Sequence, residues 1–434
     1  MNFNNNIYLT RRKQLAKSMR EGVAIISNGS ESIRNNDVHY KFRENSYFYY
    51  LTGFNEPEAI VLIFAKPFRS VIFVKEKNPL KETWEGYLYG PKKAKEIFLF
   101  DDAFGINSFD KYLTQALGDQ KQVFCLEEQE SLLLQITQVF KKIQKSRRHG
   151  GILPEQIKVL NKYLDPLRLI KKTEEISIIR KACQISAESH VQAMKKVRPG
   201  LNEYHIESEL LYGFSQRGAS NVAYPSIVAS GSNACTLHYN ENNKPLKTGD
   251  LILIDAGCEY ENYASDITRT YPISGKFSPE QKAVYEVVLE AQKKAIEAAR
   301  KNQSFNEPHN VAIKILAEGL KDLGILKNSI DSIIEKKEYE QFYMHRTSHW
   351  MGLDVHDVGD YYSKNQQPVK LENGNIITIE PGLYFSKKSK VPLHFRGIGI
   401  RIEDDVLINN SNPEVLTRQC PKEIKELENI IGSD

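Results

Sequence analysis

Apolar residues in the second half of the chain recur at the spacing of amphipathic helices. The first such run ends at Pro199-Gly200 and has apolar side chains at Ile176, Ile179, Cys183, Ala187 and Val191. Further helices are predicted over about 203–217, 278–300 and 307–323. The second of these begins with Ser278-Pro279-Glu280-Gln281, which supplies a serine N-cap, proline at the first helical position and glutamine three residues after the cap.

Short apolar runs that are typical of strands separate these helices. They are SIVASG, LILIDAG, NIITIEPGLY and GIGIRIEDDVLI. Because the helices and strands come in alternating groups, this half of the chain is predicted to have an α+β fold.

The first half has a different pattern. A short helix is predicted over 7–20, and the strand-like runs GVAIISNG, AIVLIFA and SVIFVKE follow it. Helical and strand patterns then alternate over 91–148, which favours an α/β domain. Asp165-Pro166 breaks this pattern just before the long helix, and 434 residues suit two domains of ordinary size. We therefore expect an N-terminal domain over 1–170 and a second domain over 171–434.

Composition excludes several classes of function. The net charge of +4 is too small to indicate nucleic-acid binding, and the longest apolar runs, such as AIVLIFA, are far too short to span a membrane. The N-terminal segment has no apolar core of a secretory signal. The five cysteines are scattered and lack CxxC spacing, which indicates free thiols and no zinc–thiolate site. We expect a cytoplasmic protein that binds neither nucleic acid nor membrane.

Two carboxylates stand out in LILIDAGCEYENYASDITRT. Asp255 closes an apolar run and Asp266 precedes the next one, with turn-forming residues between them. If the two runs fold back on each other, both carboxylates lie side by side. A buried carboxylate needs a partner or a metal. These two carboxylates are therefore either metal ligands or, as an open alternative, an N-cap or the partner of Arg269 in an ion pair.

Further polar residues follow in the same half. Three of the ten histidines, His345, His349 and His356, lie in MHRTSHWMGLDVHDVG, where a helical turn and a loop are both compatible with the pattern. Imidazole is a common metal ligand and a general acid or base, although histidines of purely structural role remain an alternative.

Two more carboxylates end or line strand-like runs. Glu380 ends the run IITI before Pro381-Gly382. In GIGIRIEDD, period-two geometry places Arg401 and Glu403 on the same face of a strand, where an ordinary cross-strand ion pair is the alternative.

Together these residues indicate a metal centre. Four carboxylates and at least one imidazole, without thiolates, favour hard divalent cations such as Mn²⁺. Four carboxylates carry enough negative charge for two divalent ions, which is the arrangement used in metal-assisted hydrolysis.

The motifs DAGCEYENYASDITRT, HRTSHWMGLDVHDVG, ITIEPGLY and GIGIRIEDD closely resemble those of aminopeptidase P, the Xaa-Pro aminopeptidase of the pita-bread metallopeptidases. YFYYLTGFNEPEA resembles the N-terminal domain of that family, so the resemblance covers nearly the whole chain. It implies a C-terminal pita-bread catalytic domain and an N-terminal α/β domain of the creatinase type.

The resemblance also implies a ligand set for two metal ions. Asp255 would bind one ion and His349 and Glu380 the other, while Asp266 and Glu403 would bridge both. A hydroxide that bridges the ions would attack the Xaa-Pro amide, and Glu403 or a neighbouring carboxylate would handle its proton.

Other positions would recognise the substrate. His238, in ACTLHYN, matches a histidine that contacts the scissile carbonyl. His345, His356 and Tyr384 match the substrate pocket, and Arg401 matches an arginine that orients a ligand carboxylate.

The resemblance therefore implies a metallo-aminopeptidase that releases the first residue from peptides with proline in second position. Prolidase, an Xaa-Pro dipeptidase with the same site, is the nearest alternative. A non-catalytic pita-bread module that binds peptides is a more distant one.

The sequence departs from the family pattern at Arg346 and Ser265, where glycine is common. Asp37 and Trp84 match N-domain residues that, in some relatives, reach the site of a neighbouring subunit. The resemblance thus also implies a homo-oligomer, either a dimer or a tetramer.

Overall fold

The computed structural model describes residues 5–145 and 153–433. The chain divides into two compact units, Met1–Arg168 and Leu169–Asp434.

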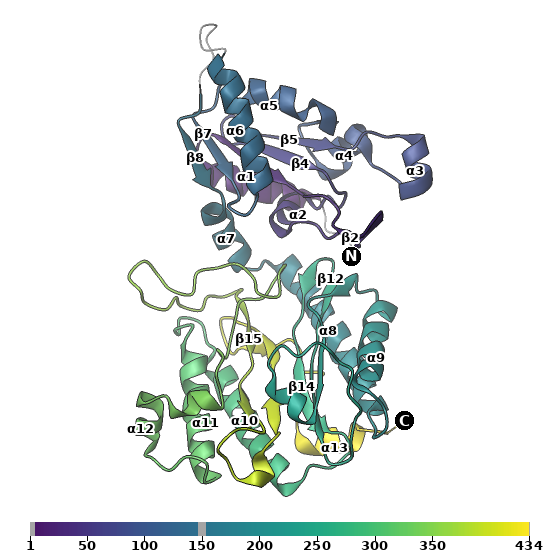
Figure 1. Cartoon of the computed structure of the whole chain (residues 1–434). Coiled ribbons are helices and arrows are strands. Elements are labelled where there is room, and N and C mark those ends of the chain that lie inside the picture. The colour runs from purple at the N-terminus through teal and green to yellow at the C-terminus, as the bar shows by residue number, and fades with distance from the viewer. Residues whose placement is uncertain (1–4, 146–152, 434) are drawn as a thin grey trace. The chain divides into compact units, whose positions relative to one another are not determined.

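The first unit contains a six-stranded mixed sheet with the strand order β6-β5-β4-β1-β7-β8 (Figure 1). Its strands are β1 (Val23–Ser27), β4 (Ile60–Phe64), β5 (Arg69–Val74), β6 (Asp102–Gly105), β7 (Gln122–Cys125) and β8 (Gln156–Val159), and β2 (Ile33–Asn35) and β3 (Val38–His39) form a separate hairpin. Its helices are α1 (Asn6–Met19), α2 (Ser46–Thr52), α3 (Pro79–Glu85), α4 (Gly90–Phe98), α5 (Phe109–Leu117) and α6 (Glu130–Lys145), and α7 (Asn161–Leu169) leads to the second unit. Apolar residues of α5 and α6 pack on the sheet, so the apolar runs expected at β1, β4 and β5 are core strands.

The second unit holds two helix pairs and several small sheets. Its helices are α8 (Thr173–Lys196), α9 (Glu203–Gln216), α10 (Pro279–Ala298), α11 (Glu307–Asp322), α12 (Ile330–Glu335) and α13 (Ile424–Ile430). Its strands are β9 (Asn221–Val222), β10 (Ile227–Ser230), β11 (Leu251–Asp255), β12 (Cys258–Tyr260), β13 (Tyr263–Ala264), β14 (Thr268–Pro272), β15 (Ile376–Ile379), β16 (Gly382–Tyr384), β17 (Gly399–Arg401), β18 (Asp404–Leu407) and β19 (Glu414–Val415). In Figure 1 the pair α8 and α9 lies on one side of the strands and the pair α10 and α11 on the other.

The helix starts follow the local chemistry of the sequence. Ser278 caps α10 by accepting a hydrogen bond from the Gln281 amide, and the Gln281 side chain accepts one from the Ser278 amide. This reciprocal cap is the one predicted from the sequence. It fixes where α10 begins and thereby how its apolar face meets the core.

The stretch that carries the first two candidate carboxylates folds into two nested hairpins. β11 pairs with β14 in antiparallel register, and Asp255 lies opposite Thr268. The shorter hairpin of β12 and β13 turns at Glu261 and Asn262, which both have positive φ. At Gly257 a Cβ atom would overlap the carbonyl oxygen of Ser265, so the chain can close here only with glycine. The fold-back predicted from the sequence is confirmed, with Asp266 just before β14.

The run IITI ends just before Glu380, as predicted from the sequence, whereas GIGIRIEDDVLI, expected as one strand, is broken in the middle. NIITIEPGLY forms β15 and β16, and GIGIRIEDDVLI forms β17 and β18, each pair divided between two sheets. The breaks fall at Glu380 and at Glu403, whose backbone amides donate to carbonyls of Thr347 and Thr268 rather than continuing a ladder. A residue at such a junction can point its side chain into the space between the sheets.

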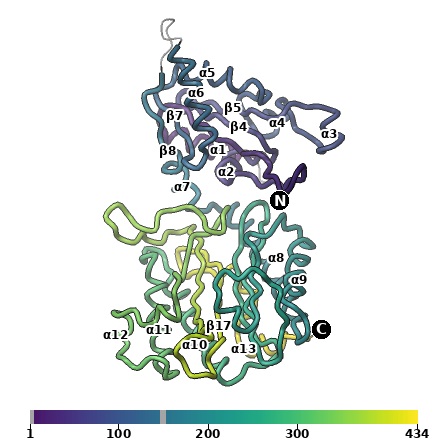
Figure 2. Tube along the Cα trace, in the orientation of Figure 1, coloured from purple at the N-terminus to yellow at the C-terminus, as the bar shows by residue number. Residues whose placement is uncertain are grey.

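In the second unit, strands from late in the chain lie beside strands from its middle. Figure 2 shows β17, from the end of the chain, within the second unit beside segments from its middle. The hydroxyl of Thr270 on β14 donates to the Arg401 carbonyl and accepts from its amide. This pairing brings residues about 130 positions apart to the same site.

Candidate metal centre

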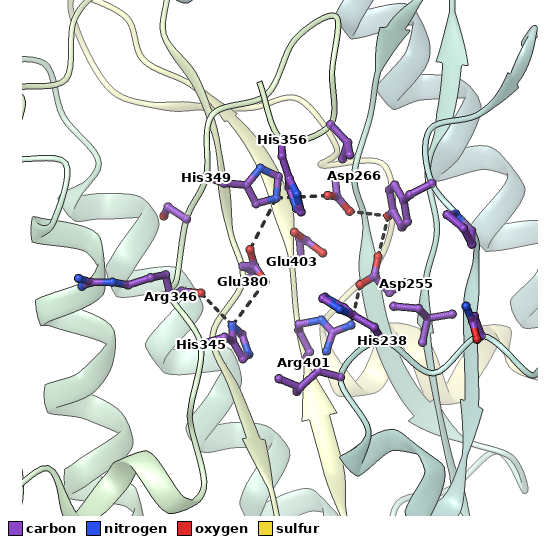
Figure 3. Close-up of a pocket in the computed structure, with 17 residues that line it drawn as sticks. His238, Asp255, Asp266, His345, Arg346, His349, His356, Glu380, Arg401 and Glu403 are labelled. Atoms are coloured by element: carbon purple, nitrogen blue, oxygen red, sulfur yellow. Dashed lines mark hydrogen bonds and ion pairs between the residues drawn. The ribbon is translucent and has the colours of Figure 1, made fainter. Parts of the chain in front are cut away.

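A pocket of about 380 Å³ in the second unit collects nearly all the candidate residues. Those that line it are His238, Asp255, Asp266, His345, His349, His356, Glu380, Arg401 and Glu403 (Figure 3). Tyr384 lies behind them, 2% exposed, with its hydroxyl against His345 and Arg401.

The five candidate ligands converge from separate elements. His349 Nε2 lies 3.5 Å from Asp266 Oδ2 and 3.7 Å from Glu380 Oε1. Asp266, His349 and Glu403 each present a ligand atom, and these atoms all lie within 4.8 Å of one another. Asp255, at the end of β11, completes the group on the side opposite His349 (Figure 3). The donor atoms gathered here are therefore carboxylate oxygens and one imidazole nitrogen.

The electrostatics of the group suit bound cations. Burial raises the pKa of Glu403 well above its usual range, and the charges of Asp266, Glu380 and Asp255 add to this rise. Burial likewise raises the pKa of Asp266 and of Glu380. Four carboxylates that share one buried site repel one another unless protons or cations offset their charge. A pair of divalent cations would replace those protons.

The imidazole of His349 has the tautomer that a metal ligand needs. Its Nδ1 lies 3.0 Å from the Trp350 carbonyl oxygen, which can only accept, so Nδ1 carries the proton. Nε2 points toward Asp266 and Glu380, so its lone pair would face them once that nitrogen is unprotonated. Burial lowers the pKa of His349, but the hydrogen bond and charge of Asp266 outweigh burial and raise it overall. A cation at this position would compete with the proton on Nε2.

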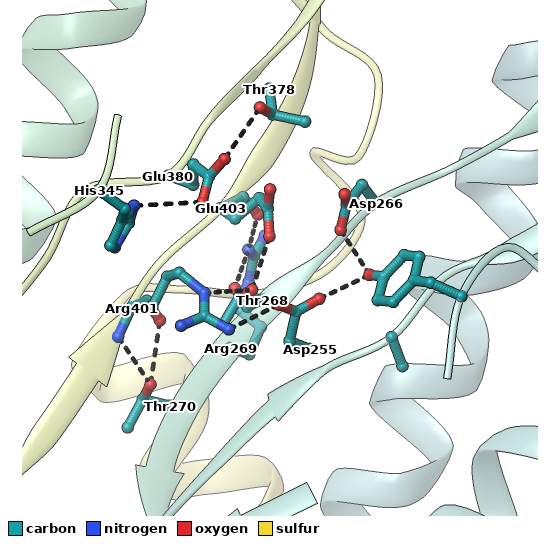
Figure 4. Close-up of polar contacts among 12 residues, drawn as sticks. Asp255, Asp266, Thr268, Arg269, Thr270, His345, Thr378, Glu380, Arg401 and Glu403 are labelled. Carbon is teal, nitrogen blue, oxygen red and sulfur yellow. Dashed lines mark hydrogen bonds and ion pairs between the residues drawn. The ribbon is translucent and has the colours of Figure 1, made fainter. Parts of the chain in front are cut away.

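Hydrogen bonds hold the carboxylates in place (Figure 4). Arg401 Nη2 donates to Asp255 Oδ2 at 2.6 Å, and the Thr268 hydroxyl donates to Glu403 Oε2 at 2.6 Å. The Thr378 hydroxyl lies 3.3 Å from Glu380 Oε1. Arg269, the alternative partner considered for Asp255, is bound to Asp404 instead.

The histidines around the ligands differ in what they can donate. His345 Nδ1 lies 2.8 Å from the Arg346 carbonyl and Nε2 lies 2.8 Å from the Tyr384 hydroxyl. Because the carbonyl only accepts, His345 donates through Nδ1 and accepts from Tyr384 through Nε2. Burial lowers the pKa of His345 to about 3, so this ring is neutral and has no spare donor.

His356 packs edge-on against His349, with ring centroids 4.4 Å apart. Burial lowers its pKa, and the neighbouring His349 lowers it further. His356 and His238 both line the pocket, His356 near His349 and His238 near Asp255 (Figure 3). Both rings therefore line the pocket without belonging to the five candidate ligands.

The two departures from the family pattern lie in different surroundings. Ser265 is fully buried, and its hydroxyl lies 2.7 Å from that of Ser186 on α8, so it supports the hairpin from behind. Arg346 is exposed and lines the pocket. In the first unit, Trp84 on α3 is 89% exposed and Asp37 lies in the turn between β2 and β3.

Tyr224 was not among the residues selected from the sequence. Its hydroxyl donates to Asp255 Oδ1 at 2.6 Å and also contacts Asp266 Oδ1. It comes from the loop between β9 and β10. An uncharged tyrosine before a proline gives no pattern that would identify it, because its role depends on two carboxylates that lie more than 30 positions away.

Replacing Tyr224 with phenylalanine is expected to weaken metal binding by roughly 10-fold, because a group that orients two candidate ligand carboxylates is removed while both carboxylates remain. Titration of the metal-free variant with Mn²⁺, followed by calorimetry, measures the change. Tyr212→Phe, an exposed tyrosine on α9, is the matched control. Equal affinity in Tyr224→Phe and the wild type would show that this hydroxyl does not support the ligands.

Comparison with known proteins gives matches over both units. The model of "Metallopeptidase family M24" matches residues 177–410, and that of "Aminopeptidase P, N-terminal domain" matches residues 8–124. The Xaa-Pro aminopeptidase of Haemophilus influenzae is 42% identical over 97% of this chain and 96% of its own length.

Solved structures agree with these matches. Pseudomonas aeruginosa aminopeptidase PepP has a TM-score of 0.97 and 41% identity, covering 99% of this chain and 98% of its own. Escherichia coli aminopeptidase P has been solved in complex with substrate, with a TM-score of 0.96, and zinc-substituted with product, with a TM-score of 0.97. Both are 37% identical and cover 99% of each chain.

Proposed function

We propose a mechanism by which the pocket hydrolyses its substrate. The chain belongs to metallopeptidase family M24 and is an Xaa-Pro aminopeptidase with the N-terminal domain of aminopeptidase P. The family, the two-domain fold and the activity predicted from the sequence are confirmed by these relatives. The observation that carries the proposal is the convergence of Asp255, Asp266, His349, Glu380 and Glu403 on one pocket.

These five residues would hold two divalent metal ions. Asp255 would bind one ion, His349 and Glu380 the other, and Asp266 and Glu403 would bridge them. Such a pair, when bound, supplies a nucleophilic water at neutral pH and polarises the scissile carbonyl. Because the ligands are carboxylates and one imidazole, we propose Mn²⁺ as the ion.

The remaining pocket residues would position the substrate and move protons. His238 and His356 would donate hydrogen bonds to the oxygen of the scissile carbonyl as negative charge develops on it. Glu403, or the neighbouring Glu380, would take the proton that the nucleophilic water releases. The same proton would pass to the proline nitrogen as the C–N bond breaks.

A chain of hydrogen bonds, here called the relay, links Arg401, Tyr384 and His345 and supports these residues. Arg401 Nη1 donates to the Tyr384 hydroxyl, which donates to His345 Nε2. Arg401 also binds Asp255, so this relay connects one wall of the pocket to the metal ligands. We assign Arg401 and Tyr384 to positioning and His345 to the pocket wall.

The substrate class fits this chemistry. An Xaa-Pro bond is a tertiary amide without an N–H, so a peptidase that relies on that donor handles it poorly. In this pocket, bound cations would instead polarise the scissile carbonyl, and imidazoles would donate hydrogen bonds to its oxygen. The free amino group of the peptide would lie near the carboxylates, close to Asp255.

A comparison of two peptides separates this proposal from the dipeptidase alternative. The Mn²⁺-loaded enzyme is expected to release alanine from Ala-Pro-Ala as well as from Ala-Pro, with Ala-Ala-Ala as the uncleaved control. Chromatography of the products measures this. Cleavage confined to Ala-Pro would favour the dipeptidase and contradict the assignment of longer peptides as substrates.

We also propose that the chain forms a homo-oligomer, either a dimer or a tetramer. Leu80, Trp84 and Tyr87 expose 77%, 89% and 54% of their surface within one short stretch of the first unit. Apolar side chains grouped in this way favour a protein contact. Light scattering on the intact protein tests the proposal, and a monomeric mass at micromolar concentration would contradict it.

The cytoplasm remains the proposed location. All five cysteines are free thiols, which suits a reducing compartment. Within residues 5–145 and 153–433, no helix has the length and apolar character needed to cross a bilayer. Fractionation of cells that express the protein tests the proposed compartment, and recovery outside the cytoplasm would contradict it.

A further inference from the structure

Arg346 is an unpaired cation at the pocket that the catalytic proposal does not use. It follows His345 directly and lines the same pocket as the metal ligands. Its side chain is exposed, and no carboxylate of the described part of the chain lies within ion-pair distance of its guanidinium. The Glu340 carboxylate, which lies nearby, is paired with Lys337. An exposed arginine with five donors and no anion can bind a carboxylate.

Tyr362 holds this guanidinium in place and adds a second donor. Arg346 Nη2 donates to the Tyr362 hydroxyl oxygen at 3.2 Å, and Asn306 Nδ2 donates to the same oxygen at 3.4 Å. Because both bonds use the acceptor capacity of the oxygen, the Tyr362 O–H is free to donate. The remaining donors of Arg346 and the Tyr362 O–H thus have no carboxylate acceptor among the described residues.

The charges in the pocket determine which end of a peptide meets Arg346. Figure 3 shows Arg346 on one side of the pocket, with Asp255 and His238 on the other side. The exposed arginine repels the positive amino group of a peptide, so that group lies toward the other side of the pocket. Because an aminopeptidase cuts one residue from that amino group, the rest of the peptide must extend outward from the carboxylates.

We propose that Arg346, assisted by Tyr362, recognises a carboxylate on the C-terminal side of the scissile bond. Two sources share this chemistry: the terminal carboxylate of a short peptide and an acidic side chain after the proline. Either one would favour short or acidic Xaa-Pro peptides over neutral, C-terminally blocked ones. The inference rests on the proposed function of the pocket and refines its substrate class.

Three peptides distinguish the two sources. They are Ala-Pro-Ala, its C-terminal amide Ala-Pro-Ala-NH₂, and Ala-Pro-Glu-NH₂, in which only the side chain is acidic. The wild-type enzyme, loaded with Mn²⁺, is expected to cleave at least one acidic peptide with a kcat/KM roughly three- to ten-fold above that of the neutral amide. The difference is expected in KM rather than in kcat, and is expected to shrink as ionic strength rises.

Variants of Arg346 test whether it causes the preference. In Arg346→Gln the ratio of kcat/KM between acidic and neutral peptides is expected to fall to about one, whereas Arg346→Lys should keep part of it because the charge remains. Arg198→Gln, an exposed arginine outside the pocket, is the matched control and should keep the wild-type ratio.

The outcomes separate the inference from the proposal on which it rests. If the wild type cleaves all three peptides with equal kcat/KM, or if Arg346→Gln keeps the wild-type ratio, Arg346 does not recognise a carboxylate. The activity itself would still stand in both cases. If the wild type cleaves none of the three peptides, the proposed function of the pocket fails as well.

Discussion

Replacing Asp266 with alanine is expected to lower kcat/KM for Ala-Pro-Ala by at least about 10³-fold. This corresponds to the loss of about 4 kcal/mol of transition-state stabilisation, the scale expected when metal-assisted polarisation is removed. Asp266 lies 3.5 Å from His349, is contacted by the Tyr224 hydroxyl, and shares a candidate ion position with Glu403. Its loss would therefore affect both proposed ions.

The measurement combines steady-state kinetics in excess Mn²⁺ with the metal content of the purified variant. Asp322→Ala, an exposed aspartate on α11, is the matched control and should retain wild-type turnover and metal content. Circular dichroism confirms that the variant is folded. Near-normal turnover in a folded Asp266→Ala variant would refute the bridging role of this residue.

Much of the candidate site could be predicted because the proposed ligands interrupt apolar strand patterns. Asp255 closes β11, and Glu380 follows β15, so each stands out as a charge at the end of a buried run. Both carboxylates line the pocket: burial raises the pKa of Glu380, and Asp255 is paired with Arg401. Their individual roles, single or bridging, came from family resemblance and remain proposals.

The parts that could not be predicted depend on contacts between distant residues. The pattern of GIGIRIEDDVLI suggests one strand, but the pairing of the Glu403 amide with the Thr268 carbonyl ends β17 and starts β18 in another sheet. Lys171 and Asp357 form a fully buried ion pair, 2.9 Å apart, across 186 positions. No local periodicity reports such a pair, just as none reports Tyr224.

A buried arginine beside the site is expected to matter for stability rather than for chemistry. Arg269 is fully buried, and its Nη2 donates to Asp404 Oδ1 at 2.7 Å and to the Cys420 carbonyl at 2.7 Å. Its Nη1 donates to the Glu403 carbonyl, so it supports the junction between β17 and β18. Burial alone would raise the pKa of Asp404, but Arg269 and Lys422 outweigh burial and hold it well below its usual range.

Replacing Arg269 with methionine is expected to lower the free energy of unfolding of the second unit by about 3–5 kcal/mol, because the buried Asp404 and several carbonyls lose their partner. Urea unfolding followed by tryptophan fluorescence measures this, since Trp350 is buried in the second unit. Arg180→Met is the matched control: its ion pair with Glu414 is 46% and 35% exposed and should contribute at most about 1 kcal/mol.

Because the pKa of Asp404 is lowered by folding, its stabilising contribution is present at neutral pH and is lost as the pH falls through its folded-state pKa. The difference between wild type and Arg269→Met should therefore narrow on strong acidification, whereas equal stability of the two proteins at neutral pH would show that Lys422 alone suffices to balance Asp404.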